Sequence, residues 1–458
     1  MQFLTKLRPR MNQVNQSLKV AIVGSGPAGC YAAAALLKSF TEINIDIYDR
    51  LFSPYGLVRS GVAPDHSKIK NVQAQFEKTL SDPRCRFMGN VDIGKDIAFS
   101  ELHKLYSAVI LTHGADSDRK LNLTGEDLSG SYTATEFVAW YNCHPEFADR
   151  HFNFSTKRAA IIGQGNVAID VARILVKPVE QLALTDIGTH AVKALSNSTI
   201  EDIYVIGRRG PVQAAFTDKE LKELGEISDC EVVIDKSVLE LSDIDKQELE
   251  QTDKVKRSNF RVLNELAEMP SRSAKRRLHL IFFRSPVEIS GNGKVENLKL
   301  EKNTLTGSVG NQKASGSGVF EDLPVDLIFR SVGYLGNQIP GLPFDSNRGV
   351  YPNERGRVLG ADGEHLQGVY TAGWIKRGPS GVIGTNKACS VETVNSIVED
   401  GLTPSNGDVD ELIKQKGLRV ITFADWRKLD AEEIRRGVEK GKEREKFVSV
   451  EDVFAFLS

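Results

Sequence analysis

Two glycine-rich stretches decide the fold of this chain: VAIVGSGPAG at residues 20–29 and AAIIGQGNVA at residues 159–168. In each stretch a short apolar run precedes the glycines, and a segment with a helical pattern follows them. The order of strand, glycine turn and helix is typical of a parallel sheet that holds a dinucleotide at the helix N-terminus. We therefore predict an α/β protein with two Rossmann-like domains, each built on a doubly wound, mostly parallel sheet.

The first stretch has the three glycines that a dinucleotide site needs. Gly24 allows a tight turn, Gly26 lets the backbone approach a pyrophosphate, and Gly29 lets the helix pack close to the strand. Asp49 ends the next apolar run, at the position where a carboxylate accepts hydrogen bonds from a ribose. The combination favours a dinucleotide site over a glycine turn without a ligand.

The second stretch differs from the first in two ways. Ala168 stands where the third glycine would be, and the next apolar run ends in Gly207-Arg208-Arg209-Gly210, where an NAD site would carry an acid. Two guanidiniums suit a 2′-phosphate, which accepts charge-assisted hydrogen bonds. The sequence therefore predicts NADP(H) rather than NAD(H), the alternative being a surface Arg-Arg turn. Two such sites in one chain suit hydride transfer from a nicotinamide to a flavin.

Composition excludes several other classes. A chain of 458 residues exceeds one ordinary core. Its net charge of −2 argues against a nucleic-acid partner, and no apolar run approaches the roughly 20 residues of a membrane helix. The five cysteines are scattered without a Cys-x-x-Cys pair, so we expect neither a redox dithiol nor an iron–sulfur or other metal site.

The order of strand-like and helix-like segments predicts one nucleotide-binding domain inserted into another. The first domain is expected to comprise residues 19–117 and 339–458, and the second residues 118–338. Residues 306–318 are interpreted as a flexible loop. Residues 1–18 are interpreted as a basic arm or the remnant of a targeting segment, because the first 41 residues contain no Asp or Glu.

Ionisable residues near the two turns are candidates for proton handling. Asp65 and His66 follow a glycine-rich loop, and Asp170 lies just beyond the second glycine turn. A His–carboxylate pair can orient water and handle protons beside a flavin. The alternative is that Asp65 caps the following helix and His66 is merely exposed.

A basic cluster lies between residues 254 and 277 and follows an acidic stretch at residues 243–253. Such a face can steer an acidic protein partner. The alternative is a set of ordinary solvated helices. The cluster comprises Lys254, Lys256, Arg257, Arg261, Arg272, Lys275, Arg276 and Arg277.

The chain resembles the mitochondrial-type ferredoxin–NADP reductases, the adrenodoxin reductase family, from about Lys19 to the C-terminus. The resemblance rests on motifs in a fixed order: VAIVGSGPAG (20–29), YGLVRSGVAPDH (55–66), IIGQGNVAIDVARIL (161–175), VIGRRGPVQAAFTDKEL (205–221), FFRSP (282–286), GWIKRGPSGVIGT (373–385) and FADWRKLDAEE (423–433).

This resemblance implies FAD in the first domain, NADPH in the second, and electron delivery to a small acidic [2Fe–2S] ferredoxin. It also implies a mitochondrial location on the matrix side, and we expect a monomer with at most peripheral association with the inner membrane. The implied FAD contacts, beside Gly24, Gly26 and Gly29, are Ala28, Asp49, Leu57, Ile93, Trp374, Gly381, Val382 and Ile383. The implied NADP contacts are Gln164, Gly165, Asn166, Val167, Arg208, Arg209, Glu220 and Gly381.

The family's proton-handling pair falls on His66 and Asp170. Its ferredoxin-docking arginines fall on Arg257 and Arg261, with Lys222 where an arginine is expected. Other functions remain open at this stage. A flavin disulfide reductase would need a cysteine pair, and an electron-input subunit of a larger flavoenzyme would bring iron–sulfur cysteines. A non-enzymatic NADP(H)-sensing protein would bind NADPH without reducing a flavin.

Overall fold

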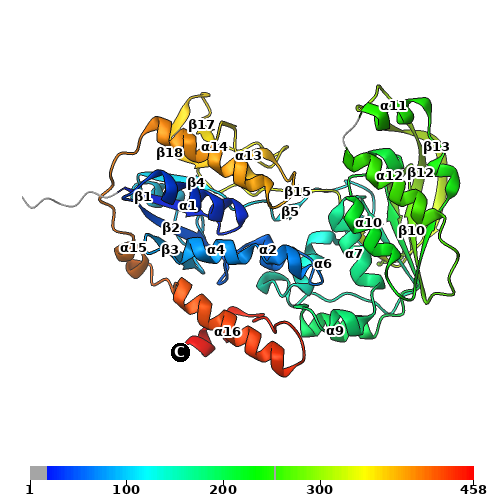
Figure 1. Cartoon of the computed structure of the whole chain (residues 1–458), viewed down its shortest axis with the longest axis horizontal. Helices are drawn as coiled ribbons and strands as arrows, with labels where there is room; N and C mark the ends of the chain where they lie inside the picture. The colour runs from blue at the N-terminus through cyan, green and yellow to red at the C-terminus, as the bar shows by residue number, and fades with distance from the viewer. Residues whose placement is uncertain (1–17, 252–253) are drawn as a thin grey trace, which may run out of the picture. The chain divides into compact units, whose positions relative to one another are not determined.

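The computed structural model describes residues 18–251 and 254–458, which form two compact units (Figure 1). Unit 1 comprises Met1–Tyr55, of which 1–17 are not described, with Ala74–Ala115 and Gly336–Phe423. Unit 2 comprises Gly56–Gln73, Asp116–Leu335 and Ala424–Ser458. The predicted basic arm at residues 1–18 therefore lies, except for Leu18, outside the described residues.

Unit 1 is built on a seven-stranded sheet with the order β16-β17-β18-β4-β1-β2-β3. The pairs from β18 to β3 are all parallel, and the two pairs at the β16 edge are antiparallel. The strands are β1 (Lys19–Val23), β2 (Asn44–Asp49), β3 (Cys85–Gly89), β4 (Ala108–Leu111), β16 (Asn353–Glu354), β17 (Arg357–Leu359) and β18 (His365–Thr371).

The central strands of unit 1 are apolar runs because both faces of a parallel sheet are covered. Val20, Ala21 and Ile22 of β1 have no exposed surface. The helices α1 and α14 pack against each other in this unit (Figure 1). The helices of this part are α1 (Pro27–Ser39), α4 (Gln73–Leu80), α5 (Phe99–His103), α13 (Trp374–Arg377), α14 (Thr385–Asp400) and α15 (Val409–Gln415).

Unit 2 is built on a six-stranded sheet with the order β6-β14-β7-β8-β10-β9, in which every pair is parallel. The two sheets confirm the predicted Rossmann-like α/β fold. The strands are β6 (Ser131–Thr133), β7 (Arg158–Ile162), β8 (Asp202–Ile206), β9 (Cys230–Ile234), β10 (Arg276–Ile281) and β14 (Leu327–Arg330).

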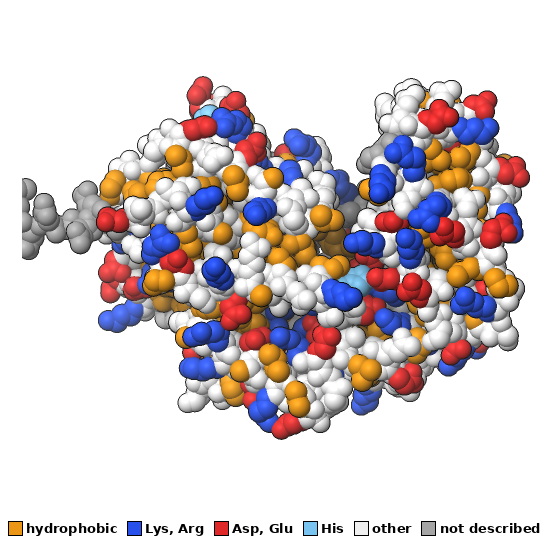
Figure 2. Space-filling view, in the orientation of Figure 1, with side chains coloured by type: hydrophobic (Ala, Val, Ile, Leu, Met, Phe, Trp, Pro, Cys, Tyr) orange, Lys and Arg blue, Asp and Glu red, His pale blue; other side chains and the backbone are white. Residues whose placement is uncertain are grey.

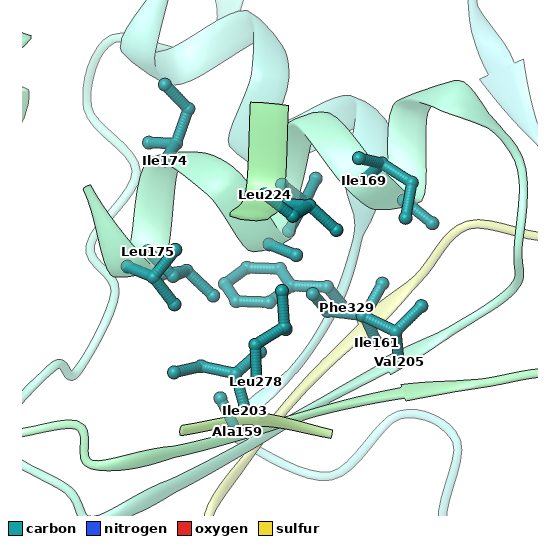
Figure 3. Close-up of a cluster of buried hydrophobic side chains, with 14 of the residues drawn as sticks. Ala159, Ile161, Ile169, Ile174, Leu175, Ile203, Val205, Leu224, Leu278 and Phe329 are labelled. Carbon is teal, nitrogen blue, oxygen red and sulfur yellow. The ribbon is translucent and has the colours of Figure 1, made fainter. Parts of the chain in front are cut away.

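The core of unit 2 lies between its sheet and α7 (Asn166–Val176), as Figure 3 shows. Ile169 and Leu175 of this helix face strand residues such as Ile203 and Phe329, and all four are buried. The other helices are α2 (Leu57–Ser60), α3 (Ser67–Lys70), α6 (Ala134–Tyr141), α8 (Val179–Leu182), α9 (Thr189–Ser196), α10 (Asp218–Gly225), α11 (Asp243–Gln251), α12 (Lys254–Ala267), α16 (Phe423–Glu439) and α17 (Val450–Leu457), with short 3-10 turns η1 (Pro145–Phe147), η2 (Pro211–Gln213) and η3 (Lys236–Leu239).

A smaller antiparallel sheet extends unit 2: β11 (Arg284–Ser290), β12 (Asn297–Thr306) and β13 (Lys313–Pro324). The segment interpreted as a flexible loop, 306–318, is thus largely the tip and second strand of a hairpin. Its polar, glycine-rich residues pair through the backbone, so their composition gave no signal of a strand. A two-stranded ladder joins β5 (Ser117–Asp118) and β15 (Tyr334–Leu335).

Two segments that the sequence assigned to the first domain pack in unit 2 instead: Gly56–Gln73 and Ala424–Ser458. Buried ion pairs account for their position. Arg59 Nη2 lies 2.5 Å from Glu433 Oε1, which joins α2 to α16. Lys70 Nζ lies 2.7 Å from Asp186 Oδ1, and Lys446 Nζ lies 2.9 Å from Asp186 Oδ2.

Candidate functional site

The first glycine turn joins β1 to α1, and its geometry excludes side chains. Gly24 has φ +107°, and a Cβ there would lie 2.6 Å from the Cα of His113. A Cβ on Gly29 would lie 2.0 Å from the carbonyl oxygen of Gly24. The N-cap of α1 is Gly26, followed by Pro27, so no side chain covers the amide groups that a pyrophosphate would approach. This turn fits a dinucleotide.

Asp49 lies at the end of β2, beside this turn. Its Oδ2 accepts hydrogen bonds from Ser25 N (2.9 Å) and Ser25 Oγ (2.5 Å), and its Oδ1 accepts one from Leu51 N (3.0 Å). Burial raises the pKa of this carboxyl despite those donors. Asp49 therefore holds the glycine turn in place through Ser25, a role that could not be predicted from the sequence.

The other proposed FAD residues divide between the units. Ile93 is buried in unit 1, and Trp374 begins α13 and donates from Nε1 to the carbonyl of Ser380 at 3.2 Å. The preceding Gly373 would place a Cβ 2.5 Å from that of Ala28, so this segment packs on the start of α1. Gly381, Val382 and Ile383 follow in the same unit. By contrast, Leu57 belongs to unit 2.

The second glycine turn joins β7 to α7 in unit 2. Gly163 has φ +132°, and a Cβ there would lie 2.1 Å from the carbonyl of Ser331, whereas a Cβ on Gly165 would meet no described atom within 4 Å. The space above Gly165 is thus open toward the helix N-terminus. Asn166 Oδ1 accepts from Thr217 N at 2.8 Å, and Gln164 Nε2 donates to Ile281 O at 2.9 Å, so both side chains help build the turn.

Arg208 and Arg209 follow β8 and carry positive charge without a carboxylate partner. Arg208 is exposed and Arg209 half-buried. Over residues 18–251 and 254–458, no hydrogen bond or ion pair occupies either guanidinium. Their backbone is held firmly, because Asn303 Nδ2 donates to Arg208 O at 2.8 Å and Phe283 N donates to Arg209 O at 3.0 Å. Free guanidiniums on a fixed turn fit an anionic ligand.

His66 lies among carboxylates in unit 2. Its Nε2 is 2.9 Å from Glu223 Oε2 and 3.6 Å from Glu220 Oε2, and its Nδ1 is 3.9 Å from Asp170 Oδ1. The ring is only 9% exposed. Burial alone would lower the pKa of His66, but the bond to Glu223 and the neighbouring carboxylates raise it above its ordinary value. The structure thus brings His66 and Asp170 together.

Arg173 is a residue of this site that the sequence reasoning missed. Its side chain is 1% exposed, and its guanidinium bonds to Asp65 (2.8 Å), Asp170 (2.7 Å) and Glu220 (3.0 Å). Lys177 Nζ also binds Asp65, at 2.9 Å. Asp65 is therefore an ion-pair partner rather than a helix cap. The sequence offered one signal for this role, an arginine on the apolar face of the helix α7.

The same carboxylates bear on whether a metal ion fits here. Ligand atoms of His66, Asp170 and Glu220 lie within 4.8 Å of one another. The guanidinium of Arg173 bonds to both carboxylates and supplies the positive charge that an ion would otherwise bring. This donor set therefore fits proton handling better than metal binding.

The expected docking residues lie on two helices of unit 2. Lys222 is on α10, and Arg257 and Arg261 are on α12. Arg257 Nη1 donates to the carbonyls of Leu249 and Glu250 near the end of α11, and Arg261 pairs with Glu265. Figure 2 shows Lys and Arg side chains gathered over α10 and α12, with acidic side chains among them.

The eight-residue basic cluster does not form one face. Arg276 and Arg277 belong to β10 rather than to α12. Arg277 pairs with Asp202 at 2.7 Å, and Lys256 pairs with Glu248 at 2.6 Å. Residues that are neighbours in this part of the sequence therefore bind different carboxylates. Of the expected docking residues, Lys222 lies on α10, and Arg257 and Arg261 lie on α12. Within the described chain, no helix is long and apolar enough to cross a membrane.

Two mostly parallel sheets, each with a glycine turn that begins a helix without a side-chain cap, define an oxidoreductase of the dinucleotide-binding flavoprotein class. No family model matches the chain. It is 43% identical to the mitochondrial NADPH:adrenodoxin oxidoreductase of Arabidopsis thaliana, over 96% of this chain and 95% of that protein. It is 44% identical to the NADPH-ferredoxin reductase FprA of Mycobacterium leprae, over 95% of this chain and 97% of that protein.

A solved structure of FprA from Mycobacterium tuberculosis matches with a TM-score of 0.91 and 42% identity, covering 96% of this chain and 99% of that one. A structure of the same protein in complex with NADPH matches with a TM-score of 0.90. The chain belongs to the family of NADPH:adrenodoxin oxidoreductases and NADPH–ferredoxin reductases. The plant and animal relatives are named as mitochondrial and the mycobacterial ones are not.

Proposed function

We propose that this protein is an FAD-dependent NADPH:ferredoxin oxidoreductase that uses unit 1 for FAD and unit 2 for NADPH. The observation that carries this proposal is the pair of glycine turns, each of which begins a helix whose N-cap has no side-chain hydrogen bond. Beyond the strand after the second turn, Arg208 and Arg209 have no side-chain partner among the described residues. When bound, FAD accepts a hydride from NADPH and releases the two electrons singly to a [2Fe–2S] ferredoxin.

The residues of unit 1 hold and orient the FAD. Gly24, Gly26 and Gly29 admit the pyrophosphate to the start of α1, with Ala28 beside them, and Asp49 offers its carboxylate to a ribose. Ile93, Trp374, Gly381, Val382 and Ile383 of unit 1 are proposed as further FAD contacts, and so is Leu57, which belongs to unit 2.

The residues of unit 2 hold NADPH. Gln164, Gly165, Asn166 and Val167 present the start of α7 to the pyrophosphate, and Arg208 and Arg209 bind the 2′-phosphate. Glu220 and Gly381 are proposed as further contacts.

His66 and Asp170 are proposed to hold and move protons. The carboxylates around His66 raise its pKa, which favours protonation of the ring, and Asp170 Oδ1 lies 3.9 Å from Nδ1. Arg173 keeps the carboxylates in place.

The electron acceptor is proposed to be a small acidic [2Fe–2S] ferredoxin that docks on Lys222, Arg257 and Arg261. The positive side chains over α10 and α12 support this choice (Figure 2). Disulfide chemistry is not favoured, because the five cysteines are free thiols and burial raises the pKa of four of them, Cys143 and Cys230 to about 11.

The test is NADPH-driven reduction of cytochrome c, measured with and without added [2Fe–2S] ferredoxins. Ferredoxin should stimulate the rate strongly, whereas ferricyanide reduction should proceed without it. If no ferredoxin stimulates the rate, the proposal that a ferredoxin is the electron acceptor is wrong. Retained NADPH binding without flavin reduction would favour an NADP(H)-sensing protein instead.

We further propose that the protein acts in mitochondria on the matrix side, as a monomer with at most peripheral membrane association. The naming of its plant and animal relatives supports the location. Fractionation of the source cells tests the location, with release by a salt wash as the test of peripheral attachment. Sedimentation of the purified protein tests the monomer.

A further inference from the structure

The turn that carries Arg208 and Arg209 ends in a buried glutamine. The 3-10 turn η2 (Pro211–Gln213) follows directly, and Gln213 is 6% exposed. Its Nε2 donates to Asp245 Oδ1 at 2.9 Å and to Glu248 Oε2 at 3.3 Å. Both carboxylates lie on α11, which packs against η2.

Asp245 and Glu248 form a buried acidic pair, 8% and 3% exposed. Gln312 Nε2 donates to the same two oxygens as Gln213, at 2.9 and 3.3 Å. Lys256 Nζ binds Glu248 Oε1 at 2.6 Å, and Ser242 Oγ donates to Asp245 Oδ2 at 2.6 Å. Every carboxylate oxygen of the pair thus has a donor from this chain.

Two buried carboxylates are costly to desolvate, so their presence needs an explanation beyond stability. Burial would raise the pKa of each, but the surrounding donors lower both below their ordinary values. The pair therefore stays ionised. Charged acceptors make shorter and stronger hydrogen bonds than neutral ones, and they fix their donors more firmly.

The arginine turn is anchored at both ends. On its strand side, Arg284 N donates to Gly207 O at 2.9 Å and Asn303 Nδ2 donates to Arg208 O at 2.8 Å. On its far side, Gln213 N donates to Gly210 O at 3.1 Å, while the side chain of Gln213 is held by the acidic pair. Two arginines recognise a phosphate only while their backbone keeps its position, because bidentate bonding tolerates little displacement.

We propose that Asp245 and Glu248 are positioning residues for coenzyme choice: through Gln213 they fix the turn from which Arg208 and Arg209 read the 2′-phosphate of NADPH. This inference rests on the proposed function. The oxygens of the pair accept hydrogen bonds from this chain, so the pair acts through Gln213. It acts on affinity for the 2′-phosphate and leaves the rest of the coenzyme site unaffected.

The test replaces Gln213 with methionine, which keeps the length of the side chain and removes its amide. The Michaelis constants for NADPH and NADH are measured with ferricyanide as acceptor. The variant loses both hydrogen bonds from Gln213 Nε2 to the acidic pair, and we expect the KM for NADPH to rise on the order of tenfold. The KM for NADH and both kcat values should stay within about twofold of wild type.

A control and a second variant complete the design. The control is Asp243→Asn, on the same helix as the acidic pair. The side chain of Asp243 is 91% exposed, so this variant should change the KM for neither coenzyme. Glu248→Gln should shift the same ratio in the same direction as Gln213→Met. Titration with 2′,5′-ADP should show weaker binding in both variants, whereas 5′-AMP should bind as in wild type.

The outcomes separate the inference from the function on which it rests. If the wild-type protein does not distinguish NADPH from NADH, the proposed function is wrong. If the wild type does, and both variants keep its KM ratio, the inference alone is wrong. If a variant loses activity equally with NADPH and NADH, as an unfolded variant would, the inference is also wrong, because the acidic pair then has only a structural role.

Discussion

Arg173 binds the carboxylates next to His66. Replacing it with methionine removes this positive charge while keeping most of the side chain's length. Its guanidinium is 1% exposed and bonds to Asp65, Asp170 and Glu220. Removing one partner from a buried ion pair leaves an uncompensated charge and costs about 3–5 kcal/mol. Lys177 still binds Asp65, so we expect a loss toward the lower end of that range.

The assay is thermal unfolding followed by circular dichroism. For a unit of this size, about 3 kcal/mol corresponds to a fall in Tm of roughly 6–12 °C. The matched control is Arg435→Met on α16, because Arg435 pairs with Glu432 and Glu439 but is 56% exposed. Exposed pairs contribute little, so this variant should melt close to wild type.

The difference in Tm between Arg173→Met and the wild type should also change with pH in a definite direction. In the wild type, the ion pairs with Arg173 and Lys177 hold the pKa of Asp65 below its ordinary value, so its stabilising effect is present at neutral pH and is lost in acid. Burial already raises the pKa values of Asp170 and Glu220, and the charge of Arg173 opposes that effect. Without Arg173, both pKa values should rise further. Their stability contribution is then lost as the pH rises above the unfolded-state values. The Tm gap to wild type should therefore widen from pH 5 to pH 8. A gap no larger than that of Arg435→Met, or one that narrows with rising pH, would refute the reasoning.

Three further variants test the remaining parts of the site. Arg208→Ala with Arg209→Ala should raise the KM for NADPH far more than that for NADH, since each charged hydrogen bond contributes about 1.5–3 kcal/mol; an unchanged preference overturns the 2′-phosphate assignment. Arg257→Glu with Arg261→Glu should slow ferredoxin-dependent turnover and spare ferricyanide reduction, and an equal fall in both moves the docking surface elsewhere. The pKa of His66 is raised in the folded protein, so its stabilising effect is full below its ordinary value of 6.5 and is lost as the pH rises through the folded-state pKa. His66→Gln should therefore flatten the Tm profile above pH 6, and a profile that keeps its slope contradicts the assignment.

The sequence predicted what local geometry controls. The glycines at positions 24 and 163 have positive φ values that other residues rarely adopt, so the two turns were visible as patterns. The apolar runs around them predicted buried parallel strands in the same way. His66 and Asp170 were paired through the resemblance, since 104 residues of sequence hide their 3.9 Å approach.

Long-range ion pairs explain what the sequence did not predict. Arg59 and Glu433 are 374 positions apart, and their pairing joins the two segments to each other. Lys70 of one segment and Lys446 of the other both bind Asp186, in the central segment of unit 2. Arg173 looked like one residue of an amphipathic helix, because two of its partners, Asp65 and Glu220, come from separate segments of the chain. The basic cluster between residues 254 and 277 does not form one face for a related reason, because individual side chains such as Arg277 bind nearby carboxylates.

The most direct test of the central claim, that one folded chain holds a flavin and a nicotinamide coenzyme for hydride transfer, is the visible absorbance spectrum of the purified protein under anaerobic conditions. We expect a yellow protein whose flavin band is bleached by one equivalent of NADPH and far less by the same amount of NADH. A colourless protein that stays colourless after incubation with FAD, or a flavin band that NADPH leaves unchanged, would contradict the account.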